Sequence, residues 1–382
     1  MGRGTRSQDL TDESRLKFLG HSLLDGAKTM AMDIPELSRR SLVLNALPAI
    51  ACGLGAMALP SAVHGQKSNP EASASPGTPK IWKAEYWAKR GDLSLYLYRK
   101  RMDAPRSKQN KLPVLFLAHG SSVSARPTFD LSVPGHGDYS LMDQFARYGF
   151  DVWTMDFEGY GRSSQSKGNS GIAAGVEDLK AASKVVLQET EQERFHLYGE
   201  SSGALRAGAF AMTQPERVNR LVLVSFTWTG QGSPTLAKRA ESVEYFRTHN
   251  RRPRSRETIR SIFTRDQPGT SDPAVAEAMA DAELQFGETV PTGSYLDMTT
   301  KLPLVDPLKI TSPVLIARGE YDGIASEDDL LNFFRKLAVQ DRQFVVLPGA
   351  SHSVALGANR AQFWHVMRSF LEMPPRLDAG KG

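Results

Sequence analysis

Cysteine is almost absent from this chain of 382 residues, because Cys52 is the only one. A single cysteine cannot form an intramolecular disulfide, and it excludes metal motifs or dithiol redox centres that need two cysteines. Basic helices, lysine and arginine runs interleaved with aromatics, and zinc-ligand spacings are also missing, so we expect no nucleic-acid partner despite a net charge of +5. With 40% hydrophobic and 23% charged residues, the composition is ordinary for a soluble globular protein.

Positive charge is dense in only one stretch, residues 251–260. Its five arginines are Arg251, Arg252, Arg254, Arg256 and Arg260. Runs of like charge most often form a solvated face. We therefore interpret this stretch as an exposed turn and helix start, and not as a phosphate-binding site.

Only one apolar run is long, and it covers residues 42–59 without a single charge. Its length approaches the ~20 residues that cross a bilayer. The twin-arginine pair Arg39-Arg40 directly precedes it, and Val63-His64-Gly65 follows with residues that a signal peptidase tolerates. The pattern resembles a bacterial twin-arginine (Tat) export signal, with Gln66 as the first mature residue. We expect a periplasmic or secreted protein that has no stable membrane association once the signal is removed.

Other interpretations of the leader, residues 1–65, remain open. The apolar run could stay uncleaved as an N-terminal anchor, or Cys52 could be lipidated, although Ala49-Ile50-Ala51 is a poor lipobox. Residues 1–31 are long and polar for the start of a signal, so Met30 and Met32 are candidate initiation sites. Residues 66–80 form a flexible linker by their Ser, Pro, Gly and Asn content.

From residue 81 onward, strand-like and helix-like patterns alternate, which predicts parallel βα units. Residues 93–98 favour an opening antiparallel hairpin, and the apolar run 113–118 favours a strand buried on both faces. Further strands are expected at 150–155, 195–198, 218–224, 314–318 and 343–347. Helices are expected at 141–148, 176–189, 202–213, 274–286, 327–337 and 361–371. Between residues 225 and 313 the alternation stops.

Ser201 lies in the pentapeptide Gly199-Glu200-Ser201-Ser202-Gly203, between an expected strand and an expected helix. A nucleophilic serine must sit on a sharp strand-to-helix turn, where glycines avoid the clashes that side chains would cause. The hydroxyl is a weak nucleophile and needs an adjacent base. We therefore interpret Ser201 as the nucleophile of a hydrolase.

His352 is the candidate base, because it follows the last expected strand and precedes the final helix. On such a loop an imidazole can take the Ser201 proton and return it to the leaving group. The third member should be a carboxylate that fixes the imidazole tautomer. Asp322, just after the strand at 314–318, is favoured, with Glu320 as the local rival and Asp306 as a distant one.

An oxyanion hole needs two backbone N–H donors aimed at the developing charge. One is expected from Ser202 at the start of its helix. The other is expected after His119-Gly120, from Ser121 or, as second choice, from Ser122. His119 itself is interpreted as a residue that shapes this turn.

These motifs occur in an order and spacing that resembles the α/β-hydrolase superfamily. They are His119-Gly120, Asp156-x-x-Gly159-x-Gly161-x-Ser163, the G-x-S-x-G around Ser201, Gly319-Glu-x-Asp322 and Gly349-Ala-Ser-His352. The resemblance covers about residues 85–372. It implies an α/β fold with a mostly parallel eight-stranded sheet and helices on both faces. The core would comprise residues 81–225 and 308–375, and a helical cap, residues 226–307, would follow the sixth strand.

Glu200 departs from the superfamily pattern, in which many members carry a neutral or aromatic residue beside the nucleophile. We expect this carboxylate to be solvated, or paired with an arginine such as Arg206 or Arg162. A structural role is favoured over a catalytic one.

The serine at the elbow argues against haloalkane dehalogenases and epoxide hydrolases, which resemble this fold but use aspartate there. The reactions that remain are hydrolysis of esters, lactones, thioesters, amides, carbamates or C–C bonds, and cofactor-free peroxidation. Ester hydrolysis is chemically the least demanding, so we predict a carboxylic-ester hydrolase with an acyl-enzyme intermediate and neither metal nor cofactor. The alternative is a non-hydrolytic binding member of the fold, which would have no need of Ser201, Asp322 and His352 together.

The substrate pocket is expected to contain aromatic side chains, which would suit an apolar or aromatic small-molecule ester. The residues predicted to line it are Ser122, Phe129, Phe226, Trp228 and Tyr245.

Overall fold

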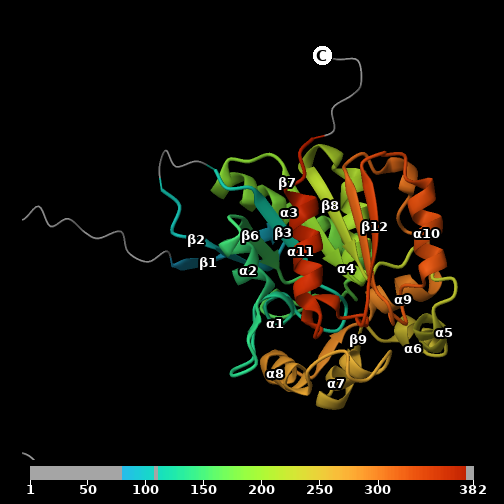
Figure 1. The fold of residues 1–382 in the computed structure, drawn as a ribbon. Helices are drawn as coiled ribbons and strands as arrows, with labels where there is room; N and C mark the ends of the chain where they lie inside the picture. Colours follow the sequence, from blue (N-terminus) through green and yellow to red (C-terminus); the bar gives the residue numbers. More distant parts are fainter. Residues whose placement is uncertain (1–79, 107–110, 376–382) are drawn as a thin grey trace, which may run out of the picture. The chain divides into compact units, whose positions relative to one another are not determined.

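An eight-stranded sheet is the central feature of the computed structural model, which describes residues 80–106 and 111–375. The strands follow the order β1-β2-β6-β3-β7-β8-β11-β12 (Figure 1). Their bounds are β1 Ile81–Arg90, β2 Leu93–Met102, β3 Val114–Ala118, β6 Asp151–Met155, β7 Phe195–Glu200, β8 Val218–Val224, β11 Val314–Gly319 and β12 Arg342–Leu347. Strand β2 pairs antiparallel with β1 and with β6, and all other neighbours pair in parallel. The predicted mostly parallel sheet is confirmed.

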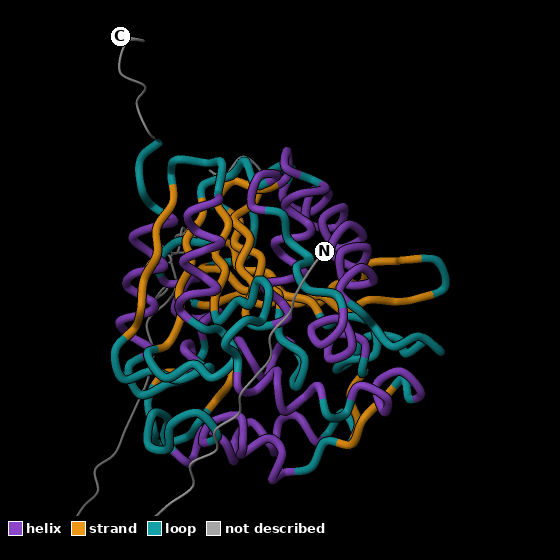
Figure 2. Tube along the Cα trace, turned by 90° about the vertical axis from the view of Figure 1, so that its right-hand side faces the viewer, coloured by secondary structure: helices purple, strands orange, loops and turns teal. Residues whose placement is uncertain are grey.

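Helices cover both faces of this sheet (Figure 2). On one face lie α3 (Ile172–Thr190), α4 (Ser202–Thr213) and α10 (Glu327–Lys336). On the other lie α1 (Ala125–Phe129), α2 (Leu141–Arg147) and α11 (Arg360–Leu371). Strand β3 shows why its sequence is continuously apolar: Phe116 packs in the first core, whereas Leu115 and Leu117 pack in the second.

The predicted elements are all present, and α4 and β8 have the predicted bounds. Helix α3 differs, since it begins at Ile172 and not at residue 176. A residue distant in sequence supplies a hydrogen-bond acceptor for its first turn, because the Ile172 N–H donates to the Asp297 carboxylate at 2.7 Å. A cap supplied by a residue so far along the chain leaves no local signal.

The segment between β8, the sixth strand of the sheet in chain order, and β11 is mostly helical. It holds α5 (Pro234–Ala240), α6 (Val243–Thr248), α7 (Arg256–Thr264), α8 (Pro273–Leu284), α9 (Gly293–Thr300) and the antiparallel pair β9 (Arg251–Pro253) and β10 (Thr289–Pro291). Helices α7 and α8 form a third core with the loop after β3, through Ile259 and Phe263 against Val123 and Leu131. The remaining elements are the hairpin β4 (Leu131–Ser132) and β5 (Asp138–Tyr139), and the 3-10 turns η1 (Pro215–Arg217), η2 (Pro307–Lys309) and η3 (Val354–Leu356).

The basic stretch at 251–260 is less exposed than predicted. Arg256 does begin helix α7, but Arg254 is only 3% exposed and forms an ion pair with Glu283. Arg251 donates to the carbonyl oxygen of Gly159 at 3.1 Å. The interpretation of a fully solvated turn is therefore wrong, because these arginines tie the inserted segment to itself and to the core.

The predicted leader, residues 1–65, and the linker up to residue 79 lie outside the described residues. Within the part of the chain that the structure describes, no helix combines the length and the apolar character needed to cross a membrane.

Candidate active site

Ser201 occupies the turn that joins strand β7 to helix α4. Its φ of 54° and ψ of −124° form a conformation that a residue with a side chain rarely adopts. Glycines make the turn possible, because a Cβ on Gly203 would overlap the carbonyl oxygen of Ala118 and one on Gly199 would overlap that of Gly203. The Ser201 N–H donates to the Val224 carbonyl at 2.9 Å. The strain is thus imposed by close packing of β7, α4 and the neighbouring strands.

His352 and Asp322 lie in contact on the loops after β12 and β11. The distance from His352 Nδ1 to Asp322 Oδ1 is 2.9 Å, and the Asp322 side chain is fully buried. That carboxylate also accepts hydrogen bonds from the N–H groups of Ile324 and Ala325, at 2.9 and 3.1 Å. Burial raises the pKa of Asp322, but His352 and these donors outweigh it and lower the pKa to about 2. The buried carboxylate is therefore ionised and can hold the ring in one orientation.

Two further side chains, those of Arg318 and Ser225, hold these loops in place. Arg318, at the end of β11, donates to the carbonyl oxygens of Ala325 and Asp322, at 2.9 and 3.3 Å. Ser225, directly after β8, donates through its hydroxyl to the His352 carbonyl at 2.7 Å. The acid and the imidazole are thus each fixed through their own backbone.

The rival carboxylates are used elsewhere. Glu320 accepts a hydrogen bond from the Gly349 N–H at 2.8 Å, and Asp306 caps η2 by accepting from Leu308 at 3.0 Å. Asp322 is therefore the carboxylate whose geometry suits a partner for His352.

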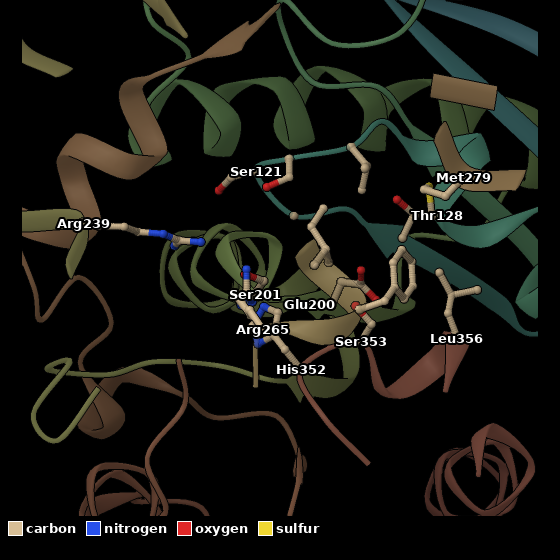
Figure 3. A pocket seen from close by; sticks show the side chains of 15 residues that line it. Ser121, Thr128, Glu200, Ser201, Arg239, Arg265, Met279, His352, Ser353 and Leu356 are labelled. Atoms are coloured by element: carbon tan, nitrogen blue, oxygen red, sulfur yellow. The ribbon is translucent and has the colours of Figure 1, made fainter. Parts of the chain in front are cut away.

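Ser201 and His352 line the same cavity, which has a volume of about 50 Å³ (Figure 3). Ser121 and Ser122, the two candidates for the second oxyanion donor, line it as well. Asp322 lies on the far side of the imidazole, bonded to Nδ1. The structure thus brings together residues from four separate loops that the sequence had singled out.

The loop after β3 passes close to the nucleophile. A Cβ added to Gly120 would lie 3.3 Å from the Ser201 Cβ. The Ser121 hydroxyl is fixed by two hydrogen bonds, because it donates to Ser202 Oγ at 2.6 Å and accepts from Ser294 Oγ at 2.8 Å. Tyr160 also donates to the Ser121 carbonyl, at 3.0 Å. The loop backbone is therefore firmly positioned beside Ser201.

His119 is fully buried beneath this loop. Its Nε2 accepts from the Phe157 N–H at 3.2 Å, so Nδ1, which lies 2.8 Å from the Gly120 carbonyl, carries the proton. Burial and the nearby charge of Arg206 lower the pKa of His119 to about 3. A neutral imidazole in this position fits the predicted turn-shaping role.

Glu200, beside the nucleophile, has a different partner from the one predicted. It accepts a hydrogen bond from the Tyr198 hydroxyl at 2.8 Å, and burial raises its pKa. Arg162 instead pairs with Glu85 at 2.7 Å, and Arg206 donates to the Ser170 carbonyl at 3.1 Å. The predicted arginine pairing is therefore wrong.

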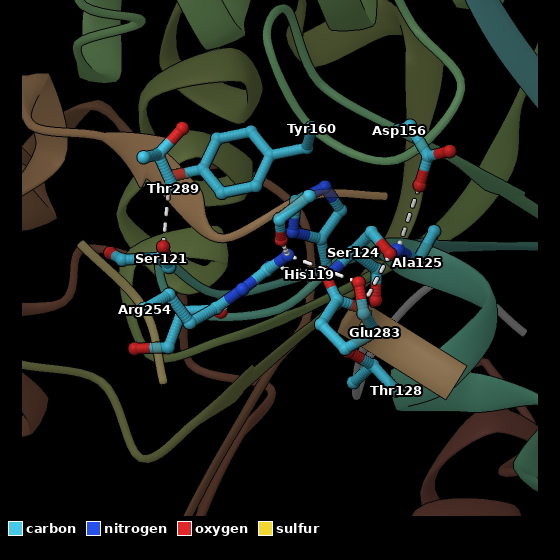
Figure 4. Close-up of polar contacts among 12 residues, drawn as sticks. His119, Ser121, Ser124, Ala125, Thr128, Asp156, Tyr160, Arg254, Glu283 and Thr289 are labelled. Atoms are coloured by element: carbon cyan, nitrogen blue, oxygen red, sulfur yellow. Dashed lines mark hydrogen bonds and ion pairs between the residues drawn. The ribbon is translucent and has the colours of Figure 1, made fainter. Parts of the chain in front are cut away.

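A buried ionic network, which was not predicted from the sequence, links Glu283, Arg254 and Ser124 (Figure 4). Glu283 on α8 accepts hydrogen bonds from the N–H and the hydroxyl of Ser124, at 3.0 and 2.7 Å. Arg254 donates to the same carboxylate and, at 2.6 Å, to the Gly287 carbonyl. Asp156 anchors the next residue, since it accepts from the Ala125 N–H at 2.8 Å. These contacts join the inserted segment to the loop that carries Ser121.

Glu283→Ala is expected to lower the free energy of unfolding by about 3–5 kcal/mol, because it leaves a buried guanidinium unpaired. Chemical unfolding measures this loss. The matched control on the same helix is Glu277→Ala, since Glu277 pairs with Arg256 and Arg260 at the surface and its removal should change stability little. Equal losses in the two variants would contradict a special role for the buried network.

Two of the five residues predicted for the substrate pocket line a cavity. Ser122 lines the cavity at Ser201, and Tyr245 lines a second cavity adjoining it. Phe129 is fully buried against Tyr198, and Phe226 is fully buried against Phe333, so neither faces a cavity. Trp228 packs on the same Phe333 and donates to the Val305 carbonyl. The prediction is therefore wrong for Phe129, Phe226 and Trp228, which belong to the core or to its edge.

The sheet order and the strand-to-helix turn at Ser201 define an α/β-hydrolase. Residues 136–357 match the family model described as serine aminopeptidase, S33. The matched segment is more than half of the chain, and the chain belongs to this family.

Curated relatives share shorter segments. The chain is 37% identical over 123 residues to a 2-hydroxy-6-oxononadienedioate/2-hydroxy-6-oxononatrienedioate hydrolase of Paraburkholderia phymatum, covering 32% of this chain and 38% of that protein. It is 34% identical over 187 residues to the corresponding hydrolase 1 of Pseudomonas putida, covering 48% and 58%. The chain thus spans less than two thirds of the length of these relatives.

Solved structures share the fold. A 2-hydroxy-6-oxo-6-phenylhexa-2,4-dienoate hydrolase from Rhodococcus superposes with a TM-score of 0.55 at 20% identity, covering 76% of this chain and all of that one (100%). An epoxide hydrolase from Vigna radiata superposes with a TM-score of 0.57 at 15% identity, covering 76% and 98%. At such identities the likeness shows the fold alone.

Proposed function

We propose that this chain is an exported serine hydrolase that cleaves carboxylic esters of small apolar or aromatic molecules. The supporting observation is that the strained Ser201 shares a cavity with His352, whose Nδ1 lies 2.9 Å from the buried Asp322. A purely structural serine has no need of a strained backbone beside an oriented imidazole. Residues 226–307 would act as the cap over the site.

In the proposed reaction Ser201 Oγ attacks the ester carbonyl carbon while His352 Nε2 takes the hydroxyl proton. The N–H groups of Ser121 and Ser202 would bind the oxyanion of the tetrahedral intermediate. Its collapse breaks the ester bond, and His352 returns the proton to the departing alcohol. A water molecule, deprotonated by His352, then attacks the acyl-enzyme and releases the carboxylic acid and free Ser201. Neither a metal nor a cofactor takes part in these steps.

A second candidate is hydrolysis of a C–C bond, which the similarity to the two 2-hydroxy-6-oxononadienedioate hydrolases favours. The same serine and histidine would serve it, so the site alone does not separate the two chemistries. Amide, carbamate and lactone hydrolysis, or binding without hydrolysis, are further outcomes of the test below.

The first experiment compares substrates on the purified chain. We expect p-nitrophenyl esters of graded acyl length to be hydrolysed with a far higher kcat/KM than the matching amides, because p-nitrophenoxide is a better leaving group than the anilide. The matching carbamates should also react more slowly, because the nitrogen lone pair makes their carbonyl carbon less electrophilic. A parallel assay with a 2-hydroxy-6-oxo-dienoate, which is a vinylogous 1,5-diketone in its keto form, reports on C–C cleavage. Activity only toward amides, or only toward the diketone, would overturn the ester proposal.

Export is proposed from the leader alone. In a bacterial host with a functional twin-arginine pathway, we expect the processed chain in the periplasmic fraction. The double variant R39K/R40K should accumulate unprocessed in the cytoplasm. Processing that continues unchanged in this variant would contradict the assignment.

As partners we propose only a small-molecule ester, without nucleic acid and without stable membrane association after signal removal.

A further inference from the structure

The cavity at Ser201 opens toward a second and larger one, with a volume of about 600 Å³. The two cavities share the lining residues Ser122, Arg239, Ile262 and Arg265. The small cavity is apolar on one side, where Phe263, Met279 and Leu356 line it. In Figure 3, Arg239 reaches toward Ser201 from the side opposite Met279 and Leu356. The two guanidinium groups therefore lie where the cavities join.

Both guanidinium groups have unused hydrogen-bonding capacity. Within the part of the chain that is described, Arg239 Nη1 and Arg265 Nη2 are buried atoms without a hydrogen-bond partner. Arg265 is engaged at Nε, which lies 3.2 Å from Asp266 Oδ1. A buried donor that finds no acceptor costs about 1–3 kcal/mol, and more when it is charged. An anion bound at the junction would supply the missing acceptors.

The larger cavity is rich in positive charge. Lys238, Arg239, Arg252 and Arg265 line it, against the single carboxylate of Glu241. Asp266 adds a second negative charge, next to Arg265. Arg252 is already committed, because it donates to the Tyr295 hydroxyl at 3.0 Å.

The neighbouring positive charges also act on Arg239. Its guanidinium lies 5.0 Å from the centre of the Tyr295 ring. Burial, together with the charges of Arg265 and Arg252, lowers the pKa of Arg239 to about 10. The group stays protonated near neutral pH, so the repulsion persists until a negative charge enters. Glu200 also lines the small cavity, but its carboxylate accepts a hydrogen bond from the Tyr198 hydroxyl at 2.8 Å.

We propose that Arg239 and Arg265 form an anion subsite that binds a carboxylate of the substrate, so that the substrate is a half-ester of a dicarboxylic acid or an equivalent anionic ester. The inference rests on the proposed function of Ser201. The reacting carbonyl would lie at Ser201, and the free carboxylate would accept hydrogen bonds from the two guanidinium groups. This refines the expectation of a purely apolar substrate: the apolar side of the small cavity would take only one part of the molecule.

The test compares monoethyl esters of dicarboxylic acids with ethyl esters of monocarboxylic acids of equal acyl length. At the best chain length we expect kcat/KM to favour the anionic ester by about tenfold or more, as charge-assisted hydrogen bonds allow. Arg239→Gln and Arg265→Gln should each lower kcat/KM for the anionic ester about tenfold, mainly through KM. The loss should be smaller for the neutral ester, and an unchanged Tm of each variant separates lost recognition from lost folding.

Lys336→Gln serves as the matched control, because Lys336 lies over the Trp228 ring and lines neither cavity. It should leave both substrates unaffected. If wild type hydrolyses the two ester classes equally, or if Lys336→Gln has the same effect as the cavity variants, the subsite is wrong while the esterase proposal stands.

If neither ester class is hydrolysed, the esterase proposal fails, and binding then decides on the subsite separately. A free dicarboxylate that raises the Tm of wild type but not of Arg239→Gln would support the subsite without the activity. A dicarboxylate without effect on either Tm would overturn it.

Discussion

Ser201→Ala is expected to lower kcat for ester hydrolysis by about a millionfold, the scale on which nucleophile removal acts in other serine hydrolases. Alanine removes the attacking oxygen and leaves the φ of 54° and the neighbouring glycines in place. The fold should therefore persist, with an unchanged circular dichroism spectrum. A fluorophosphonate probe should form an adduct with wild type and none with the variant.

A matched serine controls for indirect effects. Ser261→Ala alters an exposed serine on α7 that lines only the larger cavity, so we expect its kcat to stay within about threefold of wild type. Probe labelling that survives in Ser201→Ala would place the nucleophile elsewhere. Slow residual hydrolysis by Ser201→Ala would not contradict the assignment, because the oxyanion donors and substrate binding still act without the serine.

Much of the fold could be predicted because the sheet is parallel and buried on both faces. Continuous apolar runs such as that of β3 then mark strands directly, and the glycines around Ser201 mark a turn that is too tight for side chains. His352 and Asp322 follow the last strands, where the carboxyl ends of a parallel sheet collect functional residues. Position along the chain was enough to select these two residues, which the structure places in contact.

The pocket could not be predicted in the same way, because aromatic side chains serve cores and cavities alike. Phe129 ends helix α1 and Phe226 follows strand β8, and both side chains pack in a core. No sequence pattern shows whether such a side chain points into the core or into a cavity. The ionic network of Glu283 and Arg254 with Ser124 was hidden for another reason: its members come from segments far apart in the chain. Such pairings depend on tertiary packing that local patterns do not encode.

The partner of Glu200 did carry a local signal. Tyr198 lies two residues earlier on the same strand, and residues at this spacing point to the same face. A short-range hydrogen bond was therefore predictable. Solvent and an arginine were the expected partners of this carboxylate, and the tyrosine two residues earlier was not among them.

Asp322→Asn is expected to lower kcat by about 10⁴-fold, because an amide in place of the carboxylate no longer favours the tautomer in which Nε2 can accept the Ser201 proton. The Asp322 carboxylate has a pKa of about 2, so it stays ionised wherever activity is measured. Any loss of wild-type activity between pH 8 and 5 must then come from another group. The nearby control is Glu320→Gln. The Glu320 carboxylate accepts a hydrogen bond from the Gly349 N–H, and its replacement should change kcat little.

Stability provides an independent measure of the same carboxylate. A folded pKa of about 2 lies below the ordinary aspartate value of about 3.9, so ionised Asp322 contributes stability that is fully present above about pH 4. That contribution is lost as the pH falls through 4 toward 2. The Tm of wild type should therefore exceed that of Asp322→Asn at pH 7, and the difference should shrink on acidification. A difference in Tm that does not change with pH, together with a kcat close to wild type, would mean that Asp322 neither interacts with His352 as an ion nor orients it.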